Sequence, residues 1–180
     1  MKQLFVLMLA CVWLTACDKI KPVRDVDESM SDTLHYAYKA KFTSDFEIDN
    51  PKYAKIVLEI AKAYEENKLN VVRDAFADTV MADFYDGSSF RCPRDTLLQA
   101  ITNARSQFAS VTTIYAMWVS LQPRGRDDAW VSTWCRETDV LKDSTKQSMF
   151  LDENWQFNKD GKIIYMMQNA RKPRVGNAGK

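Results

Sequence analysis

The stretch Leu69–Phe90, LNVVRDAFADTVMADFYDGSSF, changes its hydrophobic period within a few residues. Its first part repeats apolar residues at every third or fourth position, which is the period of one helical face. The next part has a period of two, so Val80, Ala82 and Phe84 share one side of a predicted strand. Asp86–Ser89 then supplies turn residues. The stretch therefore predicts a helix that leads directly into the first strand of a sheet.

Further elements are predicted on both sides of this stretch. Asn50 and Pro51 can cap and open a first helix, and apolar spacing predicts another helix over about Pro93–Phe108. After position 110, long strands alternate with turn residues: Val111–Gln122, Asp128–Val140, Gln147–Asn158 and Lys162–Ala170. This order predicts the α+β class, with a cone-shaped, curved antiparallel sheet of about five strands packed on three helices.

The amino terminus is typical of a secreted protein. Lys2 precedes the apolar run Leu4–Leu14, which is too short to remain in a bilayer as a spanning helix. Leu14-Thr15-Ala16-Cys17 follows and resembles the lipobox of bacterial lipoproteins. That resemblance implies cleavage before Cys17, acyl chains such as palmitate on Cys17, and the membrane as a partner. An ordinary signal peptide that is cleaved near a cysteine is the alternative.

We therefore expect four parts in the chain: a cleaved lipoprotein signal peptide over 1–16, a lipidated cysteine and tether over 17–49, a folded domain over 50–171, and a polar tail over 172–180. The tether is dense in charge and poor in apolar periodicity, although its aromatic second half could lie along the domain. The expected location is the cell envelope, and the residues do not decide between the inner and the outer membrane.

Charge and cysteine content argue against several functions. The chain has Lys+Arg 25 and Asp+Glu 24, whereas a nucleic-acid surface needs a clear basic excess. Cys92 and Cys135 would remain in the mature chain, either as a disulfide or as two buried thiols. Neither has a C-x-x-C partner or a nearby histidine, so we expect no metal and no cofactor.

Several short motifs resemble one known group of proteins. They are Tyr64–Leu69 (YEENKL), Phe76–Val80 (FADTV), Asp86-Gly87 and Trp155–Ile163 (WQFNKDGKI). In this order they look like the SnoaL-like polyketide cyclase group of the nuclear transport factor 2-like superfamily. The resemblance implies a cone-shaped fold with an interior pocket and, commonly, a dimer through the outer sheet face. It implies no single reaction, and the histidine of the His–Asp pair in some catalytic members has no counterpart here.

The hairpin registers predict the interior face of the sheet. A turn centred near Ser144 sets Cys135 opposite Glu153. The Asp160-Gly161 turn sets Glu153 opposite Gln168. The expected ligand pocket follows from these registers and from the opening strand: Phe84, Leu151, Trp155, Phe157, Met166 and Gln168, with Met149 and Ile164 on the same face.

Glu153 is the candidate catalytic residue on that face. In an apolar interior its pKa should rise, which is how such a pocket obtains a general base near neutral pH. Glu137 on the neighbouring strand would act in the same direction through like-charge repulsion. The alternative places Glu153 near the open rim, hydrogen-bonded to Gln168 or to an arginine, without a chemical role.

The opposite face of the sheet is also apolar. Trp130, Trp134 and Phe150 alternate along it, together with Tyr115, Met117 and Val119 if the next strand has the matching parity. Such a face needs a cover. A homodimer would supply one, and docking of the tether segment is the alternative.

Two functions follow from these observations. The first is a lipid-anchored envelope protein whose domain binds a small hydrophobic ligand or a partner protein without turnover. The second is a cofactor-free acid–base enzyme, an isomerase, dehydratase or cyclase, with Glu153 as its base.

Overall fold

The computed structural model describes residues 36–173, and the chain divides into two compact units, Met1–Ala40 and Lys41–Lys180. The predicted signal peptide and Cys17 lie outside the described residues, as does most of the predicted polar tail. Among the helices that the structure describes, none is long and apolar enough to cross a membrane.

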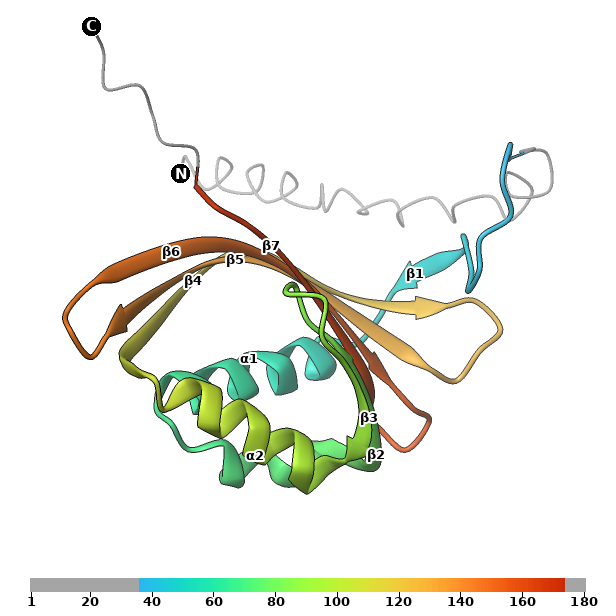
Figure 1. The fold of residues 1–180 in the computed structure, drawn as a ribbon. Helices are drawn as coiled ribbons and strands as arrows, with labels where there is room; N and C mark the ends of the chain where they lie inside the picture. Colours follow the sequence, from blue (N-terminus) through green and yellow to red (C-terminus); the bar gives the residue numbers. More distant parts are fainter. Residues whose placement is uncertain (1–35, 174–180) are drawn as a thin grey trace, which may run out of the picture. The chain divides into compact units, whose positions relative to one another are not determined.

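The second unit contains a sheet that curves around helices (Figure 1). Its elements in chain order are β1 (Phe46–Ile48), α1 (Lys52–Glu65), the 3₁₀ helix η2 (Leu69–Ala75), β2 (Phe76–Asp83), β3 (Ser89–Pro93), α2 (Arg94–Arg105), β4 (Phe108–Pro123), β5 (Ala129–Leu141), β6 (Lys146–Phe157) and β7 (Ile163–Arg171). The prediction of an α+β domain, with a curved sheet packed on three helices, is confirmed.

The predicted sheet is corrected in two respects. It has seven strands in the order β1-β4-β5-β6-β7-β2-β3, rather than about five. It is mixed rather than antiparallel, because β2 and β7 pair in parallel and their register sets Ala82 opposite Met166. The strands missing from the prediction are β1 and β3, which have three and five residues and too little alternation to give a signal.

The opening stretch forms the junction that was predicted, with a tighter helix. Leu69–Ala75 is a 3₁₀ helix, and its last residue is followed at once by Phe76 in extended backbone. Val80 and Ala82 are buried against the helices. In the turn that follows, Gly87 has φ +87°, which only glycine adopts without strain, and Asp86 accepts a hydrogen bond from the backbone N–H of Ser88. The turn sends the chain back as β3.

The register between β5 and β6 differs from the predicted one by two residues. Thr133 lies opposite Glu153, and Cys135 lies opposite Leu151. A shift of two keeps every side chain on its face, because the side-chain period of a strand is also two. The predicted pairing across the last hairpin holds for Glu153 with Gln168.

One irregularity in the last hairpin changes the predicted interior face. Gln156 pairs with Tyr165, but the next pair is Phe157 with Ile163, so Ile164 has no partner in the ladder. Ile163 is therefore fully buried while Ile164 is only half-buried. Ile164, which was expected on the interior face, lies in this bulge and outside the cavity lining, and the sequence gives no signal for the bulge.

The outer face of the sheet is partly covered by the segment before α1. The backbone N–H of Arg124 donates to the carbonyl of Asp45, and Phe42 lies 5.8 Å from Trp130 between ring centroids. β1 adds an edge strand by pairing with β4. The aromatic end of the predicted tether thus docks on the domain, as was expected in part, while Trp134 and Phe150 lie beyond it on the same face.

Tyr115 does not belong to the outer face. A bulge between Tyr115 and Met117 reverses the parity of β4, so Tyr115 pairs with inward-facing Cys135 and Met117 pairs with Trp134.

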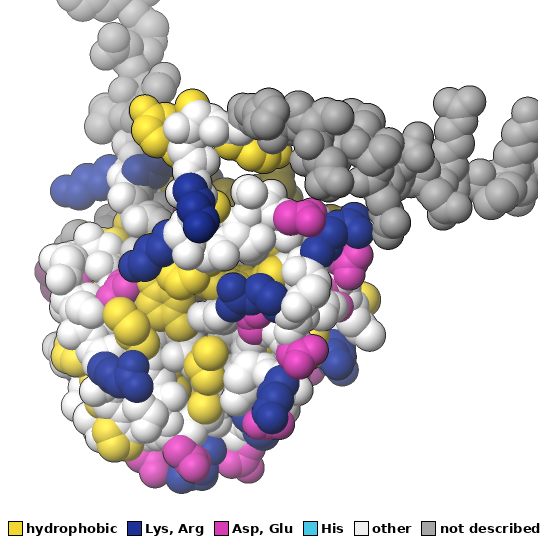
Figure 2. Space-filling model, turned by 90° about the vertical axis from the view of Figure 1, so that its right-hand side faces the viewer, with side chains coloured by type: hydrophobic (Ala, Val, Ile, Leu, Met, Phe, Trp, Pro, Cys, Tyr) yellow, Lys and Arg dark blue, Asp and Glu magenta, His cyan; other side chains and the backbone are white. Residues whose placement is uncertain are grey.

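At the end of the domain shown in Figure 2, basic and acidic side chains are interspersed around hydrophobic ones. That face therefore carries no field of a single sign.

Candidate functional site

A cavity of about 470 Å³ lies between the helices and the concave side of the sheet. Its walls come from the helices α1, η2 and α2, from strands β2 to β7, and from the loop between β2 and β3. Most of the lining is apolar or aromatic: Ile60, Tyr64, Leu69, Phe76, Phe84, Tyr85, Phe90, Ile101, Phe108, Tyr115, Met149, Leu151, Trp155 and Met166. The remaining lining residues include four with carboxyl groups, Asp86, Glu137, Asp139 and Glu153.

Most of the residues predicted for the pocket lie in this lining. They are Phe84, Leu151, Trp155, Met166 and Gln168, together with Glu153. Phe157 does not reach the cavity. It is fully buried and packs on Tyr53 of α1, with 4.8 Å between ring centroids. The interior face of β6 is longer than the cavity, so its last inward residue belongs to the core beneath α1.

Glu153 is buried and hydrogen-bonded at both carboxyl oxygens. Gln168 donates to Oε1 at 2.9 Å, while Thr133 and the Trp155 indole donate to Oε2 at 3.3 and 3.4 Å. Burial raises the pKa of Glu153, and the three donors partly oppose that rise. The hydrogen bond to Gln168 that the alternative expected is present, but Glu153 is only 9% exposed rather than at an open rim.

Glu137 on β5 is the second carboxyl group of the cavity. Burial raises its pKa to about 8, and the charges of Asp139, Glu153 and Glu65 act in the same direction. Arg105 opposes them, and no hydrogen bond contributes to the shift. The group therefore titrates close to neutral pH. The sequence signal for it was its parity, two residues beyond Cys135 on the inward face.

Asp139 lies two residues further along β5 and was not singled out from the sequence. It is 2% exposed, and its Oδ1 has no hydrogen-bond partner in the described part of the chain. Its Oδ2 accepts a hydrogen bond from Gln147 at 3.3 Å. Burial raises the pKa of Asp139, while Gln147 and Arg105 lower it. A buried carboxyl oxygen without a donor is costly and calls for a partner.

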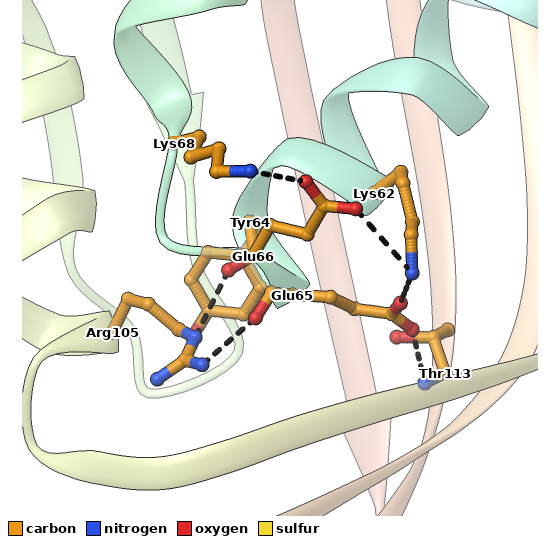
Figure 3. A network of polar contacts seen from close by, with 7 residues as sticks. All are labelled: Lys62, Tyr64, Glu65, Glu66, Lys68, Arg105 and Thr113. Carbon is orange, nitrogen blue, oxygen red and sulfur yellow. Dashed lines mark hydrogen bonds and ion pairs between the residues drawn. The ribbon is translucent and has the colours of Figure 1, made fainter.

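Arg105 at the end of α2 is the positive charge nearest to these acids. Its Nε and Nη2 donate to the backbone carbonyls of Tyr64 and Glu65 at 2.9 and 2.8 Å, as Figure 3 shows. Its Nη1 donates to the carbonyl of Phe108 at 3.0 Å. The guanidinium thus donates to two of the last carbonyls of α1, where a helix end lacks internal partners, and the carbonyl of Tyr64 also accepts from the backbone N–H of Asn67. Arg105 ties both helices to β4 and is not among the lining residues.

Three tyrosines stand near the acids. Burial raises the pKa of Tyr64, Tyr85 and Tyr115, and the charges of the cavity acids add to each rise. Their hydroxyl groups therefore stay neutral and can donate or accept hydrogen bonds.

Cys92 and Cys135 are both free thiols, and burial raises the pKa of Cys135 to about 12. Cys135 therefore lines the cavity as an unreactive thiol.

The geometry limits what the acids can hold. Among residues 36–173 no group of three or more histidine, cysteine or acidic side chains lies close enough together to hold a metal ion. Glu137, Asp139 and Glu153 instead lie along the inner face of β5 and β6, Asp86 lies in the loop after β2, and most of the remaining wall is apolar or aromatic. The arrangement can bind an apolar body, supply hydrogen bonds to it, and exchange a proton with it near neutral pH.

No known family model matches this chain, and no curated protein matches it. Solved structures do share its fold. A nuclear transport factor 2-like protein of unknown function from Exiguobacterium is 16% identical, with 67% of this chain and 99% of that chain covered and a TM-score of 0.53. A superfamily protein from Salmonella enterica is 11% identical, with 72% and 95% covered and a TM-score of 0.54.

An epoxide hydrolase of the LEH-like type from M. tuberculosis is also similar in structure. It is 11% identical, with 67% of this chain and 83% of that chain covered and a TM-score of 0.55. Identities this low show the fold and leave the activity to be argued from the site. The domain therefore has the nuclear transport factor 2-like fold.

Proposed function

We propose that the domain binds a small, largely apolar molecule in its cavity, without turnover, as part of a lipid-anchored protein of the bacterial cell envelope. The observation that supports binding is the cavity itself. Its volume of about 470 Å³ falls within the range of about 300–1,000 Å³ that is usual for ligand sites. Apolar walls with a few polar groups are also usual for such sites.

Two features favour binding without turnover. The carboxyl group of Glu153 is buried and occupied by three donors from its own domain, so it is not free to accept a proton from a ligand. No histidine is among the lining residues that the structure describes. The polar groups then orient a ligand rather than transform it.

Blocking the cavity tests this proposal. Ala104 of α2 and Ala116 of β4 are both exposed, but only Ala104 lines the cavity. Ala104→Phe should weaken the binding of phenylnaphthylamine, an uncharged probe that fluoresces in apolar sites, and Ala116→Phe should leave it unchanged. Equal binding by both variants and by the wild type would contradict the proposal.

Acid–base catalysis is the second candidate function. The observation that favours it is the pKa of about 8 at Glu137, which suits a group that takes up and returns protons near neutral pH. Glu137 fits this role better than Glu153, the base suggested by the sequence, because no hydrogen bond contributes to its shift.

Proton exchange separates the two functions. An acid–base enzyme should speed the exchange of the α-protons of β-tetralone with deuterium oxide, followed by NMR, and Glu137→Gln should remove that acceleration. An exchange rate equal to that of buffer, measured while the probe is bound, would support binding without turnover.

The lipid anchor rests on the lipobox alone, since Cys17 lies outside the described residues. Labelling of cells with palmitate should mark the wild-type protein and not Cys17→Ser. Equal labelling of both would end the lipoprotein proposal. Fractionation of the labelled cells would then assign the protein to the inner or the outer membrane.

A further inference from the structure

The charged groups of the cavity wall are all acidic. Asp86, Glu137, Asp139 and Glu153 belong to the lining, and no lysine, arginine or histidine does among the described residues. Buried acidic groups cost free energy unless they are paired. A neutral apolar ligand would not pair with them, so it does not explain why every charged group of the cavity wall is acidic.

The nearest cation cannot serve as that partner. Arg105 is 6% exposed, and all its hydrogen bonds go to the backbone carbonyls of Tyr64, Glu65 and Phe108. Its charge lowers the pKa of Glu137 and of Asp139 only against larger opposing effects. Arg105 therefore forms no ion pair with these acids.

Two of the acids keep open positions for a donor. Asp139 is 2% exposed, and its Oδ1 is unpartnered within residues 36–173. Glu137 stands two residues away on the same face of β5 and also lines the cavity. Glu153 differs, because both of its oxygens are already occupied. A donor group brought by a ligand would thus meet Glu137 and Asp139.

The other walls suit a cation with an apolar body. Aromatic rings of Tyr64, Phe84, Phe90, Tyr115 and Trp155 line the cavity, and aromatic faces attract ammonium groups electrostatically. Apolar side chains of α2 and β6, such as Ile101, Leu151 and Met149, offer surface for a hydrocarbon skeleton.

We propose that the ligand is an organic ammonium compound, a protonated amine on an apolar or aromatic skeleton, with its nitrogen between Glu137 and Asp139. The proposal rests on the proposed binding function and adds the chemical class of the ligand. A bare metal ion is a poorer fit, since the described acids do not converge on one point.

Binding of the ammonium group has a consequence for protons. The titratable and charged groups that interact with Glu137 are Tyr64 and Glu65 of α1, Arg105 of α2, Tyr85 after β2, Tyr115 of β4, Cys135 and Asp139 of β5, and Glu153 of β6. With a pKa of about 8, Glu137 is mostly protonated at pH 7. An ammonium group favours the charged carboxylate, so binding should release close to one proton at pH 7.

Calorimetry on the full chain with three probes of one shape tests the proposal. The probes are naphthylmethylamine, naphthalenemethanol and naphthoic acid, titrated at pH 7 in phosphate and in Tris so that proton release is measured from the difference in heat. The amine should bind about tenfold or more tighter than the alcohol, corresponding to roughly 1.4 kcal/mol, and should release a proton. The alcohol should release none, and the acid should bind most weakly.

Variants locate the interaction. Glu137→Gln with Asp139→Asn should remove the advantage of the amine and leave the alcohol unchanged. Asp152→Asn, on the opposite face of β6, should change neither. If the double variant does not fold by circular dichroism, Glu137→Gln alone should still abolish the proton release.

The outcomes separate this inference from the binding function. Equal affinity for amine and alcohol, or an amine advantage that survives in the variants, overturns the ammonium proposal and leaves the binding function standing. If phenylnaphthylamine binds and none of the three naphthalene probes does, the ammonium proposal is likewise overturned and the binding function stands. Failure of all four compounds to bind overturns both.

Discussion

Replacing Glu137 with glutamine should stabilise the protein in a way that depends on pH. Glutamine keeps the size and hydrogen-bonding shape of the side chain but cannot ionise. The carboxyl group has an ordinary pKa of 4.5 and a pKa of about 8 in the folded domain, mainly because of burial. Between these pH values the folded state therefore holds a proton that the unfolded state has lost.

The sign of the effect follows from that difference. Where the folded state binds more protons, the free energy of unfolding falls as pH rises. The loss is about 1.4 kcal/mol for each pH unit, so wild type should lose about 3 kcal/mol between pH 4.5 and pH 7. The loss should level off at roughly 5 kcal/mol above pH 8, and water that enters the cavity would reduce both figures. The variant lacks this contribution.

Urea denaturation of wild type and Glu137→Gln at pH 4, 5.5, 7 and 8.5 measures the effect. The two proteins should have similar free energies of unfolding at pH 4, and the variant should be increasingly more stable at the higher values. Asp152→Asn serves as the control and should follow wild type. A difference between wild type and Glu137→Gln that does not change with pH, or that favours wild type at pH 8.5, would refute the account of this cavity.

Three further changes probe the fold and its outer face. Arg105→Met should lower the free energy of unfolding by about 3 kcal/mol, because it removes three charge-assisted hydrogen bonds to part-buried carbonyls; loss of less than about 1 kcal/mol in urea denaturation would contradict that role. Gly161→Ala should cost about 1 kcal/mol in the same assay because Gly161 has φ +72°, whereas an unchanged stability would show that the turn relaxes. Trp134→Glu should shift a dimer to monomers in sedimentation experiments if copies pair through Trp130, Trp134 and Phe150 on the outer face; a wild-type monomer would exclude that homodimer.

Local patterns in the sequence were enough to predict which side of β5 and β6 faces inward. Glu153 and Gln168 pair as predicted, although the pair beside the Asp-Gly turn, Phe157 with Ile163, differs from the prediction by one residue and the bulge that follows restores the predicted register. The β5–β6 register differs by two residues, yet the faces are unchanged because the side-chain period is also two. The fold class could therefore be predicted although the exact pairs could not.

Features that depend on distant segments could not be predicted. The parallel pairing of β2 with β7 joins segments about eighty residues apart, such as Ala82 and Met166, and no local pattern encodes it. Because of the bulge after Tyr115, that side chain lines the cavity rather than the outer face of the sheet. Parity pointed to Glu153 and to Glu137, but the unpartnered Oδ1 of Asp139 depends on which side chains surround it in the fold, and parity alone does not give that.

Methionine NMR would test the central claim, that the cavity binds a small molecule, most directly. Met149 and Met166 line the cavity, whereas Met117 is exposed on the outer face at 58%. In protein labelled with ¹³C at the methionine methyl groups, naphthylmethylamine should shift the signals of Met149 and Met166 in a saturable way and leave Met117 unchanged. Saturable shifts at Met117 alone, or no saturable shift at Met149 and Met166, would contradict the claim.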